Sequence, residues 1–125
     1  MESRPITSLF DSVILIDHLN GIDAATSFLK AHLVQGGISV ITRAEVAAGY
    51  SALPPAVREF LDLFPTLPVD LATADLAASL RRQEGWKLPD ALIAATALLR
   101  EATLVTRNTK DFPPSRYGFV HIPYE

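Results

Sequence analysis

The segment from Lys87 to Leu99 constrains the fold of this chain most, because it is apolar almost all round. Its Ala, Leu and Ile residues are strong helix formers, and Pro89 suits the first position of a helix, where a missing N–H costs nothing. A helix without a polar face has to lie inside the molecule. It carries one carboxylate, Asp90, in its first turn. That acid either compensates the helix dipole or lies at the edge of a cleft, and the residue alone favours the first interpretation.

Short strands alternate with helices along the rest of the chain. We expect strands over residues 6–10, 38–41, 67–69, 103–106 and 119–122. We expect helices over residues 13–19, 23–35, 42–50, 54–64, 71–84 and 89–100. Asp23 is expected to cap the second helix and Gly36-Gly37 to end it, while Pro68 confines its strand to a sheet edge. This alternation predicts an α/β domain with a mostly parallel sheet.

The composition is that of a compact globular protein and limits the classes of function. Apolar residues make up 49% of the 125 residues and charged residues 20%, so we expect one folded domain spanning residues 1–125. The net charge of −3 argues against a general coat of positive charge for nucleic acid. No cysteine is present, no leader pattern opens the chain, and no apolar run reaches the roughly 18 residues that cross a bilayer. We therefore expect a cytoplasmic protein without membrane contact.

Polar and acidic side chains gather where the expected strands lead into helices. In open α/β sheets, ligands bind at the carboxyl ends of the strands. We expect these side chains to face one cleft: Asp11, Glu45, Asn108 and Asp111, together with Asp90 if its helix starts on the same side of the sheet.

Each acid also has a purely structural interpretation. Asp11 could cap the next helix, Thr42 and Glu45 match a capping box, and Asp111 could make an Asx-turn. Each of these interpretations is favoured when the residue is taken singly. Their occurrence together is less easily explained, because several of the junctions also carry a hydroxyl that could support an acid: Ser12, Thr42 and Thr106.

Carboxylates that converge raise one another's pKa unless a cation offsets their charge. Oxygen ligands without cysteine or suitably spaced histidine favour Mg²⁺, with Mn²⁺ as the alternative, over zinc. Such an ion engages phosphate and lowers the pKa of a bound water, so the pattern indicates metal-dependent phosphodiester hydrolysis.

Four segments resemble the PIN-domain ribonucleases, and more narrowly the VapC-type toxins of bacterial toxin–antitoxin pairs. They are residues 9–17, 41–49, 88–97 and 104–112, in the order the family has them. The resemblance implies a three-layer sandwich with a mostly parallel central sheet of four to five strands flanked by helices. It also implies a Mg²⁺-dependent endoribonuclease that acts on RNA and is inhibited by a cognate antitoxin. A homodimer, or a larger toxin–antitoxin assembly, is the implied quaternary state.

By the same resemblance Asp11, Glu45 and Asp90 form the carboxylate core, with Asp11 and Asp90 as the metal ligands. The family often has Asp where this chain has Asn108, with a further Asp at the position of Asp111. An amide coordinates through its oxygen but brings no charge. Either residue could complete the site, with one metal ion or two.

Other residues admit two interpretations. Basic residues near the cleft could hold RNA phosphates or serve only solubility: Arg43, Arg107, Lys110 and Arg116. We expect four ring side chains to be structural: His18, His32, His121 and Trp86. We expect part of one apolar stripe to form an exposed groove for the antitoxin: Val57, Phe60, Leu61 and Phe64.

Two other functions are compatible with this layout. A non-catalytic PIN-like module that binds RNA or protein is made conceivable by Asn108. A phospho-accepting receiver domain shares the acidic pocket, but it would need a paired acid after the first strand, where Ser12 follows Asp11.

Overall fold

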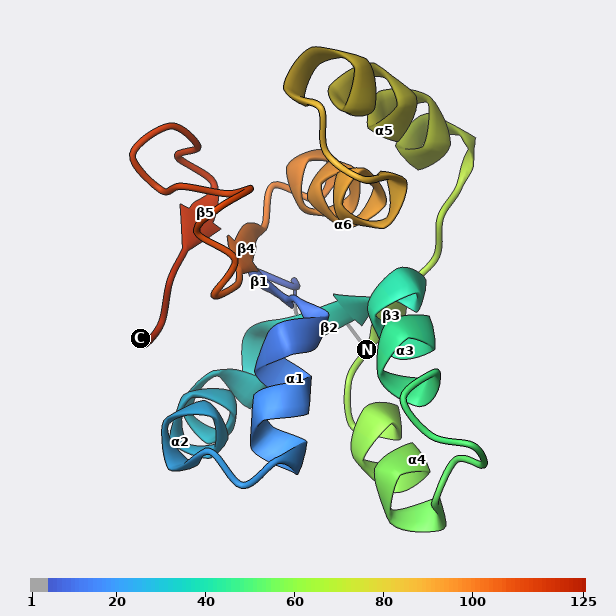
Figure 1. Ribbon diagram of the computed structural model, residues 1–125, viewed down its shortest axis with the longest axis vertical. Coiled ribbons are helices and arrows are strands. Elements are labelled where there is room, and N and C mark those ends of the chain that lie inside the picture. Colours follow the sequence, from blue (N-terminus) through green and yellow to red (C-terminus); the bar gives the residue numbers. More distant parts are fainter. Residues whose placement is uncertain (1–4) are drawn as a thin grey trace.

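The computed structural model describes residues 5–125 and shows a central sheet between two layers of helices (Figure 1). Within those residues the sheet has five strands in the order β3-β2-β1-β4-β5, and every neighbouring pair is parallel. The strands are β1 (Ser8–Phe10), β2 (Gly36–Ser39), β3 (Thr66–Leu67), β4 (Thr103–Val105) and β5 (Val120–His121). This arrangement confirms the α/β sandwich expected from the sequence.

The helices divide between the two faces of the sheet, and alternate residues of β1 serve the two sides. Leu9 faces the cluster under α5 and α6, and Phe10 faces the cluster of α1, α2, α3 and α4. The α-helices are α1 (Ser12–Leu19), α2 (Asp23–His32), α3 (Val40–Ala47), α4 (Pro55–Asp62), α5 (Leu71–Glu84) and α6 (Leu88–Leu99). A short 3₁₀ turn, η1 (Leu33–Gln35), leads from α2 into β2. None of these helices is long and apolar enough to cross a membrane.

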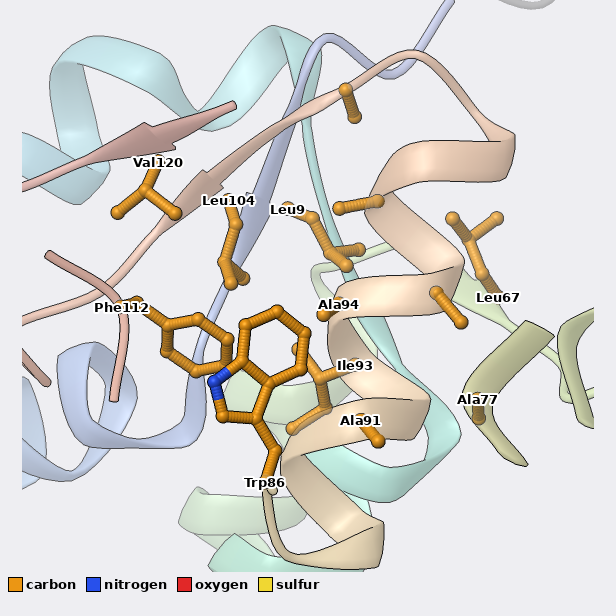
Figure 2. Close-up of a cluster of buried hydrophobic side chains, with 13 residues drawn as sticks. Leu9, Leu67, Ala77, Trp86, Ala91, Ile93, Ala94, Leu104, Phe112 and Val120 are labelled. Atoms are coloured by element: carbon orange, nitrogen blue, oxygen red, sulfur yellow. The ribbon is translucent and has the colours of Figure 1, made fainter. Parts of the chain in front are cut away.

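Helix α6 is the buried helix that the sequence predicts. Residues 93–97 are all buried, and Figure 2 shows the helix lying against Leu9 and Leu104 of the sheet. Trp86, just before the helix, is 4% exposed and packs on Phe112, with ring centroids 4.8 Å apart. Asp90, in the first turn of α6, is therefore carried by the helix of this layer that buries more of its residues.

Gly36 ends the helical segment as predicted, since it is the C-cap of η1, but the two glycines also have a second role that their sequence does not reveal. Both glycines lie inside β2, the strand beside β1. A Cβ on Gly36 would collide with the Phe10 ring, and one on Gly37 would lie 2.9 Å from Cδ1 of Ile6. The glycines are needed because side chains from β1 and its approach occupy the space beside them, and a helix-stop signal cannot be distinguished from this requirement in the sequence.

Three expected boundaries also change. Strand β2 ends at Ser39, whose hydroxyl accepts from the Ile41 N–H at 3.0 Å and caps α3, so the capping box of Thr42 and Glu45 is wrong. Ile22, not Asp23, is the N-cap of α2, which makes Asp23 its first helical residue. The edge strand is Thr66–Leu67 and ends just before the proline, as a residue without an N–H donor requires.

Candidate active site

Asp11 lies where β1 meets α1 and serves two purposes at once. Its Oδ1 accepts from the Ser12 N–H at 2.8 Å, which caps α1, and its Oδ2 accepts from the Thr106 hydroxyl at 2.7 Å. The residue is only 6% exposed. Burial raises the pKa of Asp11, and the hydrogen bonds from Thr106 and Ser12 partly offset that rise. The capping interpretation of Asp11 is thus correct without excluding a role in the cleft.

Glu45 of α3 and Asp90 of α6 face Asp11 from the two neighbouring helices. Burial raises the pKa of Glu45, and the charge of Asp11 adds to the rise while the Ser12 hydroxyl lowers it. Burial, followed by the charges of Asp11, Asp111 and Glu45, raises the pKa of Asp90 to about 6. Four carboxylates therefore lie close enough to repel one another, and Asp90 is at their centre.

Asn108 and Asp111 form a turn that is closed by its own side chains. Asn108 Nδ2 donates to Asp111 Oδ2 at 3.0 Å, and Asn108 Oδ1 accepts from the Asp111 N–H at 3.2 Å. The Trp86 indole N–H donates to the Asp111 carbonyl at 2.9 Å and fixes the turn to the core. The Asx-type bond is thus made by Asn108, not by Asp111, and the Asp111 carboxylate lies close enough for its charge to raise the pKa of Asp90.

Of the expected supporting hydroxyls, two touch the acids and one does not. Thr106 donates to Asp11 and accepts from the Asn108 N–H at 3.0 Å, so it links both sides of the site. The Ser12 hydroxyl faces Glu45. Thr42 Oγ1 is buried and has no hydrogen-bond partner within residues 5–125, so Thr42 supports none of these acids.

The donor set suits a hard divalent cation. Carboxylate and amide oxygens are available, and no cysteine is present. Among the described residues, no three His, Asp or Glu side chains are grouped closely enough to hold one ion together. Mg²⁺ is ordinarily held by one or two carboxylates and retains several waters, so Asp11 and Asp90 would be a sufficient pair. The mutual repulsion at Asp90 is the feature that a cation would relieve.

Three of the four basic residues expected near the cleft are engaged elsewhere. Ion pairs join Arg43 to Asp62 at 2.9 Å, Arg107 to Asp17 at 2.6 Å and Arg116 to Glu84 at 3.3 Å. Lys110 has no ion pair in the part of the chain that the structure describes. Lys110 is therefore the most available of the four for a phosphate group.

Three of the four ring residues pack as expected. His18 stacks on Phe60 at 4.6 Å, His32 stacks on Phe28 at 4.1 Å, and His121 lies 6.0 Å from the Phe28 ring. The stacking of His18 and His32 and the burial of Trp86 agree with the structural role predicted for them, whereas His121 is exposed.

An apolar groove lies between α2 and α4, but only part of the expected stripe lines it. Val57 and Leu61 are buried in the core, so they were wrong candidates for an exposed surface. The groove has a volume of about 270 Å³ and is lined by His18, Thr26, Leu29, Lys30, Leu33, Phe60, Leu63 and Phe64. The sequence missed the contribution of α2 because two helices far apart in the chain form the groove together.

Comparison with known proteins identifies the family. The model of the PIN domain matches residues 8–114. Ribonuclease VapC19 of Mycobacterium tuberculosis is 34% identical over 117 residues, covering 84% of this chain and 91% of the relative. A chain of a toxin-antitoxin complex from Klebsiella pneumoniae is 39% identical, with a TM-score of 0.85 and coverage of 95% and 99%. A chain of FitAcB from Neisseria gonorrhoeae is 26% identical, with a TM-score of 0.75 and coverage of 94% and 98%. This chain belongs to the VapC-type branch of the PIN-domain family.

Proposed function

We propose that this protein is a Mg²⁺-dependent endoribonuclease, the toxin of a toxin–antitoxin pair, held inactive by a cognate antitoxin. The observation that carries the proposal is the convergence of four carboxylates on Asp90, whose pKa rises to about 6. The relative named as a ribonuclease and the similar chain from a toxin-antitoxin complex support the same activity.

Each residue of the site has its own role in the proposed hydrolysis of RNA. Asp11 and Asp90 would hold the cation, which when bound supplies Lewis-acid stabilisation of phosphate oxygens and a more acidic water. Glu45 is exposed at the cleft, and its raised pKa suits a group that takes a proton from the attacking water. Thr106 fixes the orientation of Asp11 through its 2.7 Å hydrogen bond. Asn108 fixes Asp111 and leaves the metal shell to the acids.

The partner is expected to use the groove between α2 and α4. Leu63 at the groove is 60% exposed, and a monomer in water gains by covering such a surface. An apolar helix or strand of an antitoxin would fit it, and a basic side chain of the same segment would neutralise the carboxylates. We also expect a homodimer in the cytoplasm, within a larger toxin–antitoxin assembly.

Sequencing of RNA ends after induced expression tests the proposal and names the RNA. New ends should appear within minutes of induction and share a sequence context, and co-expression of the antitoxin should suppress them. An Asp11→Ala variant expressed to the same level should produce none. Ends that are the same for the wild type and this variant would indicate the alternative function, a PIN-like module that binds without cleaving.

A further inference from the structure

The loop after β4 carries an arginine for which the site has no use. Arg107 lies between Thr106 and Asn108, but its guanidinium points to Asp17 of α1. Nε donates to Oδ2 at 2.6 Å and Nη2 donates to Oδ1 at 2.9 Å. A bidentate pair of this kind fixes orientation as well as distance.

Both carboxylate oxygens of Asp17 accept hydrogen bonds in this contact. Its side chain is 11% exposed, and its Oδ2 also accepts from the Tyr124 hydroxyl at 2.8 Å. The hydrogen bonds from Arg107 hold the pKa of Asp17 below its ordinary value despite burial. The Arg107 side chain is 36% exposed, so the pair is only partly buried and its charges alone add little stability; what the bidentate contact supplies beside the site is a fixed geometry.

Two side-chain contacts, called ties below, join helix α1 to the loop that follows β4. Thr106 binds Asp11 at the start of α1, and Arg107 binds Asp17 six residues later, about 9 Å along the helix. The Trp86 bond holds the far end of the loop at Asp111, and the two contacts to α1 hold the end that leaves β4. Together these contacts set the position of the turn formed by residues 108–111.

The second tie lies outside the cleft. Ser12, whose hydroxyl faces Glu45, and Asp17 are five residues apart on α1, so they project in directions roughly 140° apart. Asp17 and Arg107 instead line a hollow with Ile22, Ala24, Tyr124 and Glu125. In Figure 1 the C-terminal end leaves β5 toward the layer of α1 and α2, which brings this end of the chain to the tie.

We propose that Arg107, acting through Asp17, is a positioning residue for the ribonuclease: it fixes the loop after β4 so that Thr106 meets Asp11 and the 108–111 turn faces the acids. The kinetic consequence of this inference rests on the proposed function, and its structural consequence rests on the hydrogen bonds of Thr106 and Arg107. It also predicts that Arg107 does not bind the RNA phosphates.

The kinetic test uses Arg107→Met, Asp17→Asn, the double variant and Arg116→Met. The last breaks the ion pair to Glu84, which touches none of the acids. With a short RNA in Mg²⁺, each single variant at the tie should lower kcat about ten- to a hundredfold with KM nearly unchanged. The kcat of the double variant should be no lower than that of the less active single variant, because each single substitution already removes the same Arg107–Asp17 contact. Arg116→Met should retain wild-type kcat.

A role in binding RNA would give the opposite pattern and would overturn the proposal. The Arg107 variant would then raise KM, reduce the salt dependence of binding, and add its effect to that of Asp17→Asn. Tyr124→Phe, which removes only one of the three hydrogen bonds to Asp17, should lower kcat less than Arg107→Met does.

A measurement that needs no cleavage separates this inference from the proposed function. The Asn108 N–H donates to Thr106 Oγ1 at 3.0 Å, so its hydrogen exchange reports the position of the loop. In Arg107→Lys, which keeps the charge but not the bidentate geometry, exchange at Asn108 should accelerate while the central strand β1 stays protected. Unchanged exchange would refute the positioning role. If the wild type cleaves no RNA while exchange at Asn108 still accelerates in Arg107→Lys, only the proposed function is refuted.

Discussion

Replacing Asp90 with Asn tests whether the acids of the site repel one another. Burial and the neighbouring charges raise the pKa of Asp90 from 3.8 to about 6. At ~1.4 kcal/mol per pKa unit, this makes the ionised form about 3 kcal/mol less favourable, and screening at a half-buried group reduces the value to about 1–2 kcal/mol. Asn also loses about 0.3–1 kcal/mol of favourable interaction with the helix dipole. The net expectation is a metal-free Asp90→Asn variant about 1 kcal/mol more stable than the wild type at pH 8.

The pH dependence follows from the direction of the shift. Because the folded pKa of Asp90 is raised, the wild type keeps this stability below pH 4 and loses it as the pH rises through about 6. The advantage of Asp90→Asn should therefore be present at pH 8 and absent at pH 4. Thermal unfolding in EDTA at both values measures it, with an expected rise in Tm of about 4 °C at pH 8.

Asp23 supplies the matched control, since it is an exposed acid in the first turn of α2. Asp23→Asn removes only the dipole interaction and should lower the free energy of unfolding by about 0.3–1 kcal/mol at pH 8. If Asp90→Asn also lowers Tm at pH 8, Asp90 is an ordinary first-turn acid and the repulsion inferred here is wrong. Asp90→Asn should also have no measurable RNA cleavage, whereas Asp23→Asn should keep it.

Three further predictions concern the same regions. Millimolar Mg²⁺ or Mn²⁺ should raise the Tm of the wild type and not that of Asp90→Asn, because only the folded site binds the ion; an equal shift in both would contradict the site. Asn108→Asp places a carboxylate against Asp111 and should lower metal-free stability by about 1–3 kcal/mol while it tightens Mg²⁺ binding in titration calorimetry; equal affinity would place residue 108 outside the metal's influence. Gly36→Ala should lower stability by about 1–3 kcal/mol in denaturant titration, because the added Cβ meets the Phe10 ring, and a neutral result would show that β2 can shift.

The fold and the acidic residues could be predicted because each depends on local pattern. Helix α5 ends at Glu84 before Gly85, which adopts φ 76°, and the buried helix begins within one residue of its expected start. Asp11 and Glu45 could be assigned to one cleft because parallel strands place their carboxyl ends together, whereas Asp90, which opens a helix that follows another helix, is placed there by the family resemblance.

What could not be predicted depends on contacts between distant residues. Gly36 matches a helix stop in sequence, and only the Phe10 ring beside it explains a glycine in a strand. Arg107 resembles any basic residue near an acidic cleft, and its partner Asp17 lies 90 residues away in the chain. The α2–α4 groove likewise combines helices whose separate patterns indicate burial.

Cleavage of a defined RNA by the purified protein tests the central claim most directly. The rate should depend on Mg²⁺, disappear in EDTA and in Asp11→Asn, and survive in Asp23→Asn, whose acid lies on another helix and outside the cleft. Cleavage that persists in EDTA, or that is equal in wild type and Asp11→Asn, would contradict the claim that these converging carboxylates form a metal-dependent ribonuclease site.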